Sequence, residues 1–262
     1  MELKRLKLLL EMKATFFLNV SGGRDSAVAA AVAVELLRSL DPSARIYALY
    51  AHTPLALEEN LKYVQKLAEW LDVPLLVARP SEGLESLVRR GFPSRRRRWC
   101  MYRWKLQPML EVAERFPPPH VHVFGIRLSE STRRLRLFNK YAERGEQVWY
   151  YCSKWRNYCA YYFAPILDWS GEQVLRYIEE RKLPKSPFWS SGHSSHDCAI
   201  CICYAGFRDW LVFKQKHPEL WKKIYSVYRE LNERRRRKEK VLAWNYVDLD
   251  DIARTASLMD FV

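Results

Sequence analysis

The segment that most constrains the fold is residues 15–26, where a β-forming run passes directly into a glycine turn and then a helix. Residues 15–20 (TFFLNV) are apolar and β-forming, residues 21–26 read SGGRDS, and residues 27–40 are apolar with strong helix formers. These are the parts of one β-α unit. Two glycines let the backbone point its N–H groups at an anion, and a helix N-terminus adds partial positive charge. The segment therefore predicts a phosphate-binding loop.

Strands and helices alternate along the first two thirds of the chain. The pattern predicts further strands at residues 46–51, 74–78 and 121–125, and helices at residues 57–71 and 172–181. Parallel strands need long crossover connections, so the alternation predicts an α/β fold with a doubly wound, Rossmann-like parallel sheet. Ligands bind such sheets beyond the carboxyl ends of the strands, where residues 21–26 and 127–133 would both lie.

A stretch containing proline and serine, residues 184–195, begins a shift in composition. We expect a nucleotide-binding α/β domain over residues 1–185 and a smaller region over residues 186–262 that is helical and carries cysteines. Within it, residues 218–240 predict a long amphipathic helix. Its apolar face is predicted to contain Trp221, Ile224, Tyr225, Tyr228 and Leu231.

Charge and hydropathy indicate the kind of partner. No run of residues approaches the roughly 18 to 20 apolar residues of a membrane span, so we expect a cytoplasmic protein with no membrane partner.

The net charge is +14, and two runs of four arginines occur at residues 95–98 and 234–237. Such an excess favours polyanions, from nucleotide phosphates to tRNA or DNA. A solvated basic surface accounts for the arginine runs equally well.

Four of the six cysteines form a candidate metal site. Cys198, Cys201 and Cys203 lie close together in sequence, and Cys100 lies far upstream. In a reducing compartment, cysteines are more often metal ligands, redox groups or buried thiols than disulfide partners. Closely spaced thiolates can converge on one metal centre, and sulfur ligands suit an iron–sulfur cluster or zinc.

Two alternatives to an iron–sulfur cluster remain open. His193 and His196 directly precede Cys198 and could complete a tetrahedral zinc site. A redox-active dithiol is the other reading. The remaining cysteines, Cys152 and Cys159, lie in a strongly aromatic stretch, where we expect buried, inert thiols.

Further sequence blocks follow the glycine loop in a fixed order. They are His52-Thr53 with Glu58-Glu59-Asn60; GFPS, RWC and KLQP between residues 91 and 108; GIRLSESTRR at 125–134; and PILDWS with VLRYI between residues 165 and 178. Together with SGGRDS, they resemble the motifs of phosphoadenosine-phosphosulfate (PAPS) reductase-like proteins, within the adenine nucleotide α-hydrolase, or PP-loop ATP pyrophosphatase, superfamily. His52 departs from the aspartate that is usual in that family.

The resemblance implies an adenine nucleotide at the loop, either ATP with Mg²⁺ or adenylyl sulfate (APS) or PAPS. Guanidinium groups such as those of Arg127 and Arg133 suit a phosphate or sulfate, and Lys105 could add a point charge. Glu130 could hold Arg127, bind ribose or ligate Mg²⁺. Asp25 and Arg127 are the candidate catalytic residues. The candidate nucleotide-binding residues are Ser21, Gly22, Gly23, Asp25, Ser26, Lys105, Arg127, Glu130, Ser131 and Arg133.

Cys100, within the RWC block, and the downstream Cys198, Cys201 and Cys203 resemble the cluster-binding cysteines of iron–sulfur members of the family. This likeness implies a 4Fe–4S cluster, with zinc as the alternative. A complete SGGxDS loop accompanies ATP cleavage at the α phosphate in this superfamily, whereas sulfonucleotide reductases carry a degenerate loop and a catalytic cysteine near the C-terminus. No cysteine follows Cys203 in this sequence.

We therefore expect an ATP-pyrophosphatase-type sulfurtransferase. The resemblance to DNA phosphorothioation proteins and iron–sulfur tRNA thiolases implies adenylation of an acceptor, followed by sulfur transfer, by analogy of fold. The acceptor would be tRNA or DNA, and a sulfur-donor protein would be a further partner. The alternatives are an oxidoreductase that reduces adenylyl sulfate or PAPS and a nucleotide-binding partner subunit without turnover.

Overall fold

A computed structural model describes residues 2–153, 157–189, 198–237 and 247–255, without the side chains of Glu2 and Arg133. Each of its two units is assembled from segments that are separate in sequence. The first unit consists of Met1–Tyr50, Glu58–Ala78 and Met109–Ser190, and the second of Ala51–Leu57, Arg79–Pro108 and Ser191–Val262. The expected boundary near residue 185 lies close to Ser191, where the last segment of the second unit begins. The second unit also includes two earlier segments of the chain.

The first unit contains a six-stranded sheet in the order β3-β2-β1-β4-β6-β5. Its strands are β1 (Thr15–Asn19), β2 (Arg45–Ala51), β3 (Leu75–Ala78), β4 (His120–Val123), β5 (Val148–Cys152) and β6 (Cys159–Phe163). β1 pairs in parallel with β2 and β4, β4 pairs in parallel with β6, and β5 is antiparallel to β6. The chain proceeds outward to β3 and then crosses to β4 on the other side of β1. The predicted doubly wound α/β fold is confirmed.

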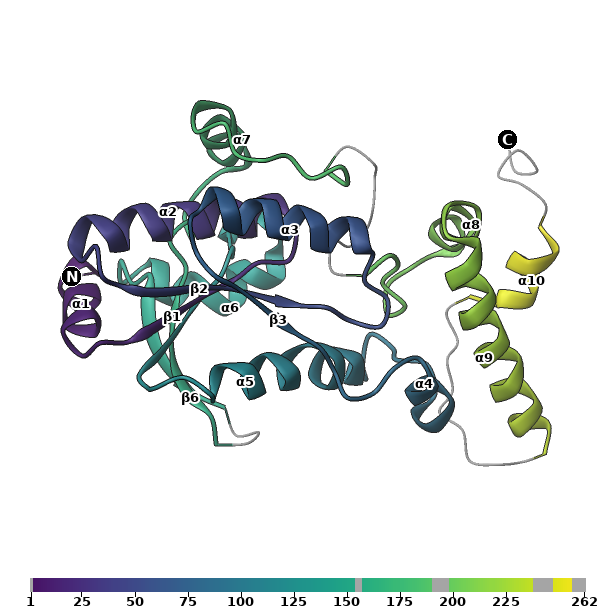
Figure 1. Ribbon diagram of the computed structural model, residues 1–262. Coiled ribbons are helices and arrows are strands. Elements are labelled where there is room, and N and C mark those ends of the chain that lie inside the picture. The colour runs from purple at the N-terminus through teal and green to yellow at the C-terminus, as the bar shows by residue number, and fades with distance from the viewer. Residues whose placement is uncertain (1, 154–156, 190–197, 238–246, 256–262) are drawn as a thin grey trace. The chain divides into compact units, whose positions relative to one another are not determined.

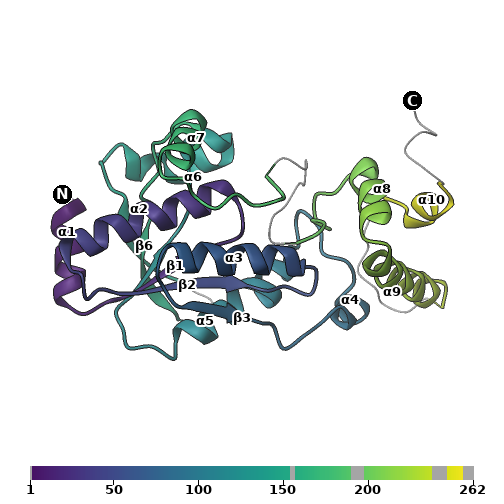
Figure 2. The same ribbon diagram turned by 45° about the horizontal axis from the view of Figure 1, so that its top comes forward.

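Helices cover both faces of this sheet. They are α1 (Glu2–Glu11), α2 (Arg24–Leu40), α3 (Glu58–Trp70), α5 (Gln107–Ala113), α6 (Thr132–Ala142) and α7 (Gly171–Glu180). In both Figure 1 and Figure 2, α2 and α3 lie on one face and α5 on the other. Side chains alternate along a strand, so Phe16 and Leu18 of β1 enter the main core, while Phe17 contacts Phe116 on the opposite face. Full burial of each such side chain contributes about 1.5–3 kcal/mol.

The pair β5–β6 is the part of the sheet that the sequence pattern did not predict. Antiparallel pairing places Cys152 directly opposite Cys159, and the two sulfurs form a disulfide. Both cysteines are exposed. The expectation of buried, inert thiols is therefore wrong at these positions, because the register of the hairpin brings two edge cysteines face to face.

The second unit is helical and has its own core. Its elements are α4 (Glu85–Arg90), a π-helical turn η1 (Met101–Leu106), α8 (Phe207–Lys216), α9 (Pro218–Arg236) and α10 (Leu249–Arg254). Trp104, Trp210 and Ile224 are almost fully buried in this core. The core also includes Leu55 and Leu87 from the earlier segments, which explains why these segments belong to the second unit.

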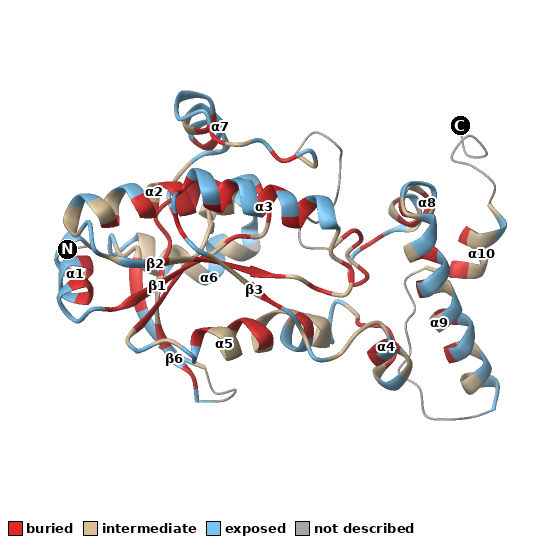
Figure 3. Ribbon diagram, viewed as in Figure 1, coloured by how far each residue is buried: buried red, intermediate tan, exposed pale blue. Residues whose placement is uncertain are grey.

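Helix α9 confirms the predicted amphipathic helix as far as Arg236, and residues 238–240 lie outside the described part of the chain. Trp221, Ile224, Tyr228 and Leu231 are buried, whereas the opposite side is exposed. Figure 3 shows this alternation of buried and exposed residues along α9, and shows the central strands buried over most of their length. Among the described helices, none is both long enough and apolar enough to cross a membrane.

Candidate nucleotide site and cysteine cluster

The glycine loop leaves β1 and begins α2, as predicted. Gly22 has φ +87°, a backbone conformation that residues with a side chain rarely adopt. A Cβ atom on Gly22 would lie 1.9 Å from Oδ1 of Asn60, so the position has no room for a side chain. Gly23 is the N-cap of α2, which starts at Arg24. A glycine is therefore required at position 22 by both the backbone conformation and the packing of the loop.

Hydrogen bonds occupy the carbonyl groups of the loop. The Asn60 side-chain amide donates to the Ser21 carbonyl at 3.1 Å, and the Trp189 indole N–H donates to the Gly22 carbonyl at 2.9 Å. The Ser26 hydroxyl donates to the Gly23 carbonyl at 2.9 Å. The first-turn N–H groups of a helix have no carbonyl partner within the helix. Those of α2 therefore form a donor set suited to an anion.

Gly125 places the loop that follows β4 against this helix start. A Cβ atom on Gly125 would lie 2.4 Å from the carbonyl carbon of Asp25 and 2.5 Å from the backbone nitrogen of Ser26. Because these are backbone atoms, they cannot move aside without shifting the phosphate loop. β1 and β4 are adjacent and parallel, and the chain leaves them toward different sides of the sheet. The two loops thus meet at the switch point, where doubly wound sheets bind ligands.

Arg127 joins the two loops by an ion pair. Its Nε lies 3.0 Å from Oδ2 of Asp25, and the two side chains are 13% and 21% exposed. Its NH1 group donates to the hydroxyl of Ser129, which donates to the Trp169 carbonyl. The guanidinium is thereby held at the edge of the phosphate loop, in an orientation fixed from two sides. The two candidate catalytic residues, Asp25 and Arg127, are in direct contact.

Glu130 lies in the same charged group. Burial raises the pKa of its carboxyl, and Asp25 adds to that rise, while Arg134 and Arg127 oppose it. Arg134 forms an ion pair with Glu130 at 2.7 Å, one helical turn away. Of the three readings of Glu130, the contact with Arg134 and the proximity of Arg127 favour a carboxylate that orders the cations around the loop.

The other candidate nucleotide residues have different positions. Ser131 is the N-cap of α6, where its hydroxyl accepts from the backbone N–H of Arg134 at 3.3 Å. The side chain of Arg133 lies outside the described part of the structure. Lys105 belongs to η1 of the second unit, whereas the other nine candidates belong to the first.

The four free cysteines come together within the second unit. Sγ of Cys100 lies 3.7 Å from Sγ of Cys203, and Sγ of Cys198 lies 3.2 Å from the hydroxyl of Thr53. The segment that carries the last three cysteines is anchored by two buried isoleucines that alternate with them, Ile200 and Ile202. Cys203 is itself buried, whereas Cys198 and Cys201 are partly exposed.

The thiols affect one another's pKa values. The hydrogen bond between Cys100 and Cys203 lowers the pKa of Cys100 and raises that of Cys203 to about 12. A hydrogen bond to Cys203, together with burial, raises the pKa of Cys201. The positive charge of Arg98 opposes the rises at Cys201 and Cys203 and adds to the lowering at Cys100, and it is the smallest of these contributions to each pKa. A cation beside several sulfurs stabilises their anionic forms, which are the forms that ligate metals.

Arg98 is held by an aromatic side chain that the sequence pattern did not single out. Its guanidinium lies 5.3 Å from the ring centre of Tyr204, and that of Arg95 lies 5.4 Å from the same ring. The Nε of Arg98 is buried without a hydrogen-bond partner among the described residues. One arginine run therefore lies directly beside the thiols.

The donor chemistry of this cluster fits a soft metal centre, because four thiols from two segments meet beside a cation. In the described part of the chain, no group of three or more His, Cys, Asp or Glu side chains is already arranged around a point that could hold a metal ion. His193 and His196, which would complete a zinc site, lie outside the described residues.

Sequence reasoning assigned no role to Gly125, Asn60 or Trp189, although all three shape the loop. Asn60 had a detectable signal, because it lies on the apolar face of α3 with Val64 and Leu67 and is itself buried. A polar residue on such a face must satisfy its hydrogen bonds internally. Trp189 had no comparable signal, since it follows a turn far from the loop in sequence.

The sequence profile of the phosphoadenosine phosphosulfate reductase domain family matches residues 15–204. The chain belongs to this family. The match covers the glycine loop, the Gly125 loop and all four free cysteines. The predicted membership of the PAPS reductase-like family is thereby confirmed.

Two relatives of this PAPS reductase-family chain are the uncharacterized proteins MJ0973 and MJ0066 of Methanocaldococcus jannaschii. The first is 25% identical over 207 residues, which are 79% of this chain and 46% of the relative. The second is 26% identical over 226 residues, which are 86% of this chain and 43% of the relative. The chain thus spans less than half the length of these relatives.

The solved structures that resemble this chain include those of two enzymes. A phosphoadenylyl-sulfate reductase from Candida auris, in complex with phosphate, has a TM-score of 0.47 and 12% identity, covering 74% of this chain and 87% of that one. The U34-tRNA thiolase NcsA from Methanococcus maripaludis, with its 4Fe–4S cluster, has a TM-score of 0.47 and 13% identity, covering 99% and 89%.

Proposed function

We propose that this chain binds ATP with Mg²⁺ at its glycine loop and cleaves it between the α and β phosphates. The observation that carries the proposal is the arrangement of the loop backbone, in which the carbonyls of Ser21, Gly22 and Gly23 all accept hydrogen bonds from protein donors. The N–H groups at the start of α2 are left to face an anion, together with the helix dipole. A phosphate chain is the ligand that this donor set suits.

The charges around the loop support a role in phosphoryl chemistry. Arg127 offers fixed donors to the oxygens of an α phosphate, and its pair with Asp25 sets the direction of those donors. Attack on the α phosphorus increases negative charge on its oxygens, and a preorganised cation stabilises that charge. Asp25 and Arg127 would thus act together, with Asp25 orienting the guanidinium and the loop.

The proposed reaction has two steps. An oxygen of the acceptor attacks the α phosphorus of ATP, and pyrophosphate leaves with the electron pair of the broken P–O bond. A nucleophilic sulfur then attacks the atom that bears the adenylated oxygen, a base carbon in tRNA or a backbone phosphorus in DNA. The bond from that atom to the oxygen breaks, and AMP leaves. The acceptor oxygen departs with AMP, so sulfur replaces oxygen without net oxidation of the acceptor. A sulfur-donor protein would replenish the sulfur.

The sulfur chemistry is assigned to the second unit. We propose that Cys100, Cys198, Cys201 and Cys203 hold a 4Fe–4S cluster, which would bind and present the sulfur. The short distance between the sulfurs of Cys100 and Cys203 supports their convergence on one centre, and Arg98 lies beside them as a cation. Zinc is the competing metal, with His193 or His196 as the additional ligand.

The proposed acceptor is a tRNA or DNA. The second unit carries 22 Lys and Arg against 12 Asp and Glu, a net charge of +10, whereas the first carries 22 against 18. Both arginine runs belong to the second unit, and Arg234 donates to the carbonyl of Val88 beside Arg89. This concentration of charge in the unit that also holds the thiols supports a polyanionic acceptor.

A second candidate function is the reduction of adenylyl sulfate or PAPS, which the family's name favours. A nucleotide-binding subunit without turnover would use the same loop.

Isothermal titration with ATP, GTP and adenylyl sulfate, followed by an assay for pyrophosphate release, separates the three candidate functions. We expect binding of ATP in preference to GTP. Tight binding of adenylyl sulfate with no response to ATP contradicts the proposal and favours sulfonucleotide reduction, and ATP binding without turnover in the presence of tRNA or DNA favours the subunit.

A further inference from the structure

Two residues outside the glycine loop determine which way its peptide groups point. We propose that Asn60 and Trp189 are positioning residues that hold the N–H groups of Gly22 and Gly23 toward the anion site. This inference rests on the proposed nucleotide site. It adds a support for the loop, here called the brace, which consists of Asn60 on α3 and Trp189 in the turn that precedes residue 190. Neither residue belongs to the loop itself.

The direction of each N–H group follows from the geometry of the peptide bond. In a trans peptide, the C=O and N–H groups point in opposite directions. The peptide between Ser21 and Gly22 is fixed because its carbonyl accepts from Nδ2 of Asn60 at 3.1 Å. The peptide between Gly22 and Gly23 is fixed because its carbonyl accepts from Nε1 of Trp189 at 2.9 Å. Their N–H groups are consequently directed to the opposite side, where that of Gly23 makes a long hydrogen bond, 3.4 Å, to the hydroxyl of Ser21, itself a candidate phosphate-binding group.

A brace is needed because this part of the loop contains adjacent glycines. Glycine populates positive and negative φ with similar ease, so a Gly-Gly peptide can rotate and present its carbonyl where its N–H group was. A carbonyl oxygen facing a phosphate repels it, whereas an N–H group attracts it. Fixing both carbonyls therefore lowers the conformational cost of binding an anion, since the donors are already oriented.

Asn60 is itself fixed in orientation. It is 1% exposed, and its Nδ2 also donates to the hydroxyl of Tyr50 at 3.1 Å. The carbonyl of Ser21 can only accept a hydrogen bond, so the amide nitrogen must face it, and the alternative amide orientation is excluded. Both hydrogens of the amide group are then used.

Trp189 is held by a local turn and by a ring contact. Its backbone N–H donates to the carbonyl of Ser186 at 3.2 Å, and the Ser186 hydroxyl accepts from the backbone N–H of Phe188 at 3.3 Å. The indole packs edge-on against the ring of Tyr63, with 5.7 Å between centroids. The indole is thus supported on α3 only three residues from Asn60.

Tyr63 provides a matched control. It is 3% exposed, it contacts Trp189 through its ring, and its hydroxyl has no hydrogen-bond partner among the described residues. Tyr63→Phe therefore keeps the ring contact and removes a group that does not act on the loop. Trp189→Phe keeps an aromatic ring beside Tyr63 but removes the N–H donor, and Asn60→Leu keeps a similar side-chain volume without the amide.

The test measures each full-length variant in two ways. Amide hydrogen exchange of residues 21–26 in the free protein reports on the loop, and titration with ATP reports on affinity, with thermal unfolding as the check on folding. We expect Trp189→Phe and Asn60→Leu to exchange faster at the loop amides and to bind ATP about tenfold more weakly, the scale of one lost hydrogen bond. Tyr63→Phe should match the wild type in both measurements.

The outcomes separate this inference from the proposed function. If the wild type binds ATP and Trp189→Phe binds it equally well, the positioning role is overturned while the nucleotide site stands. An equal loss of affinity in Tyr63→Phe also overturns it, since general packing would then be the cause. If the wild type binds neither ATP nor adenylyl sulfate, the proposed function fails. Amide hydrogen exchange then tests the positioning role without a ligand. Unchanged exchange of the loop amides in Trp189→Phe rejects that role.

Discussion

Asp25 and Arg127 belong to loops that lie far apart in sequence, yet their side chains form a partly buried ion pair at 3.0 Å. Each side chain alone would be an ordinary surface charge. The pair holds the guanidinium at the start of α2, where a phosphate would bind. Residues of this kind can be tested one at a time, because their contacts are few and specific.

Replacing Arg127 with alanine should weaken ATP binding by about 2 kcal/mol, roughly thirtyfold, because a charged donor to a phosphate is lost and Asp25 is left near the ligand without its partner. Isothermal titration measures the change. Arg134→Ala is the control, since Arg134 pairs with Glu130 on the more exposed side of the group. Equal affinities for wild type and Arg127→Ala would remove Arg127 from the site.

Gly125→Ala should destabilise the protein by about 3 kcal/mol, because the new methyl group would overlap backbone atoms of Asp25 and Ser26. The phosphate loop must shift to relieve the overlap, so ATP binding should weaken as well. Thermal unfolding and titration measure the two effects. Gly171→Ala is the matched control, since the nearest atom to its added carbon is 3.9 Å away. A stable Gly125→Ala protein with unchanged affinity contradicts the close approach.

Anaerobically prepared protein should be brown, with absorption near 400 nm and about four irons per chain. Cys198→Ala should lose the metal. Cys152→Ser should retain it, because Cys152 is bonded to Cys159 in the β5–β6 hairpin and belongs to the other unit. Metal analysis of the three proteins decides the matter. A colourless wild type with one zinc per chain would instead assign the site to zinc and bring His193 or His196 into it.

At the scale of elements, strand β4 is linked to the β5–β6 hairpin by a buried polar chain. The hydroxyl of Tyr158 lies 2.9 Å from Nδ1 of His120 and 2.8 Å from Nε2 of His122. His120 Nε2 faces the carbonyl of Phe116, so it must carry a proton, and Tyr158 donates to Nδ1. His122 then donates to Tyr158 through Nε2 and accepts from Asn19 through Nδ1. Nδ1 of His122 is then without a proton, so His122 is neutral.

Acid should destabilise the fold through this chain. Burial, with a smaller contribution from the charge of His120, lowers the pKa of His122 to about 3. An unfolded histidine titrates near 6.5, so the unfolded chain binds the proton more tightly, and the stabilisation present above pH 6.5 is lost as the pH falls toward 3. By pH 5 the loss should reach about 2 kcal/mol.

Urea unfolding at pH 7 and pH 5 measures this loss. His122→Gln keeps a polar side chain near Tyr158 but cannot take up a proton in this range, so its stability should depend less on pH than that of the wild type. An identical pH dependence in both proteins would assign the acid sensitivity to other groups.

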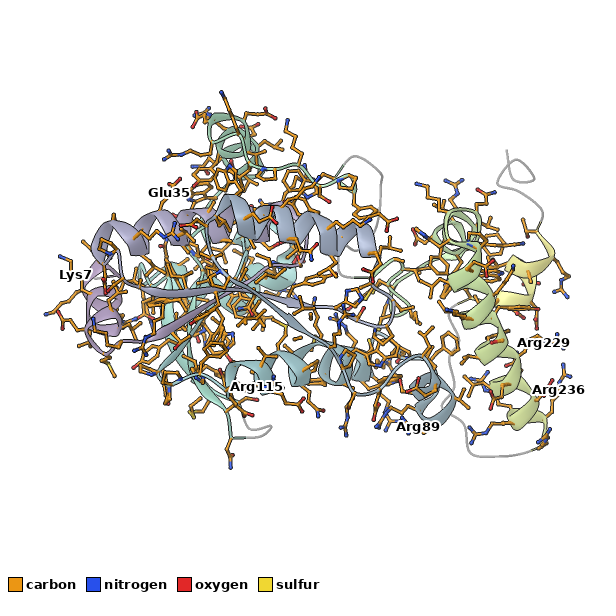
Figure 4. The ribbon with its side chains drawn as sticks, in the orientation of Figure 1. Lys7, Glu35, Arg89, Arg115, Arg229 and Arg236 are labelled. Carbon is orange, nitrogen blue, oxygen red and sulfur yellow. A yellow bond between two sulfur atoms is a disulfide. The ribbon has the colours of Figure 1, made fainter. Side chains whose placement is uncertain are left out.

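At the scale of the whole molecule, the positive charge is unevenly distributed. The second unit has a net charge of +10 out of +14. Figure 4 shows Arg229 and Arg236 extending from α9, and both are exposed. Arg234 differs from them, because it donates to the Val88 carbonyl and joins α9 to α4. In the arginine run 234–237, Arg234 thus joins two helices, Arg235 donates to the Asn232 side chain, and Arg236 and Arg237 are exposed.

Replacing Arg236 and Arg237 with alanine should reduce the salt dependence of tRNA or DNA binding and leave ATP affinity unchanged. Each lost phosphate contact lowers the slope of log K against log salt by about 0.9 on duplex DNA, because fewer counterions are released. Filter binding over a range of salt concentrations measures the slope. Lys222→Ala is the control, since Lys222 is paired with Glu219 on the same helix. If the wild type shows no salt-sensitive binding to either polymer, the arginines are a solvated surface and small sulfonucleotides become the favoured substrates.

Prediction from sequence succeeded where the signal was local. The β1 strand, the phosphate loop, α2 and the apolar face of α9 all follow from residues adjacent in the chain or within one helical turn. The β5–β6 hairpin was not predicted, because its aromatic residues lack the simple alternation of a half-exposed strand. Its cysteines were also misjudged, since their pairing depends on the register between two strands.

The doubly wound fold, the glycine loop and the family could be inferred from sequence, because backbone preferences, hydrophobic periodicity and motif order are all properties of the chain read in order. The folded chain was needed to show that Asn60 and Trp189 hold the loop carbonyls, that Gly125 must lack a side chain, and that Arg98 lies beside the thiols. The physical reason is that packing brings together groups from segments far apart in sequence. Sequence reveals which groups can bind an anion or a metal, and the fold selects the partners that orient them.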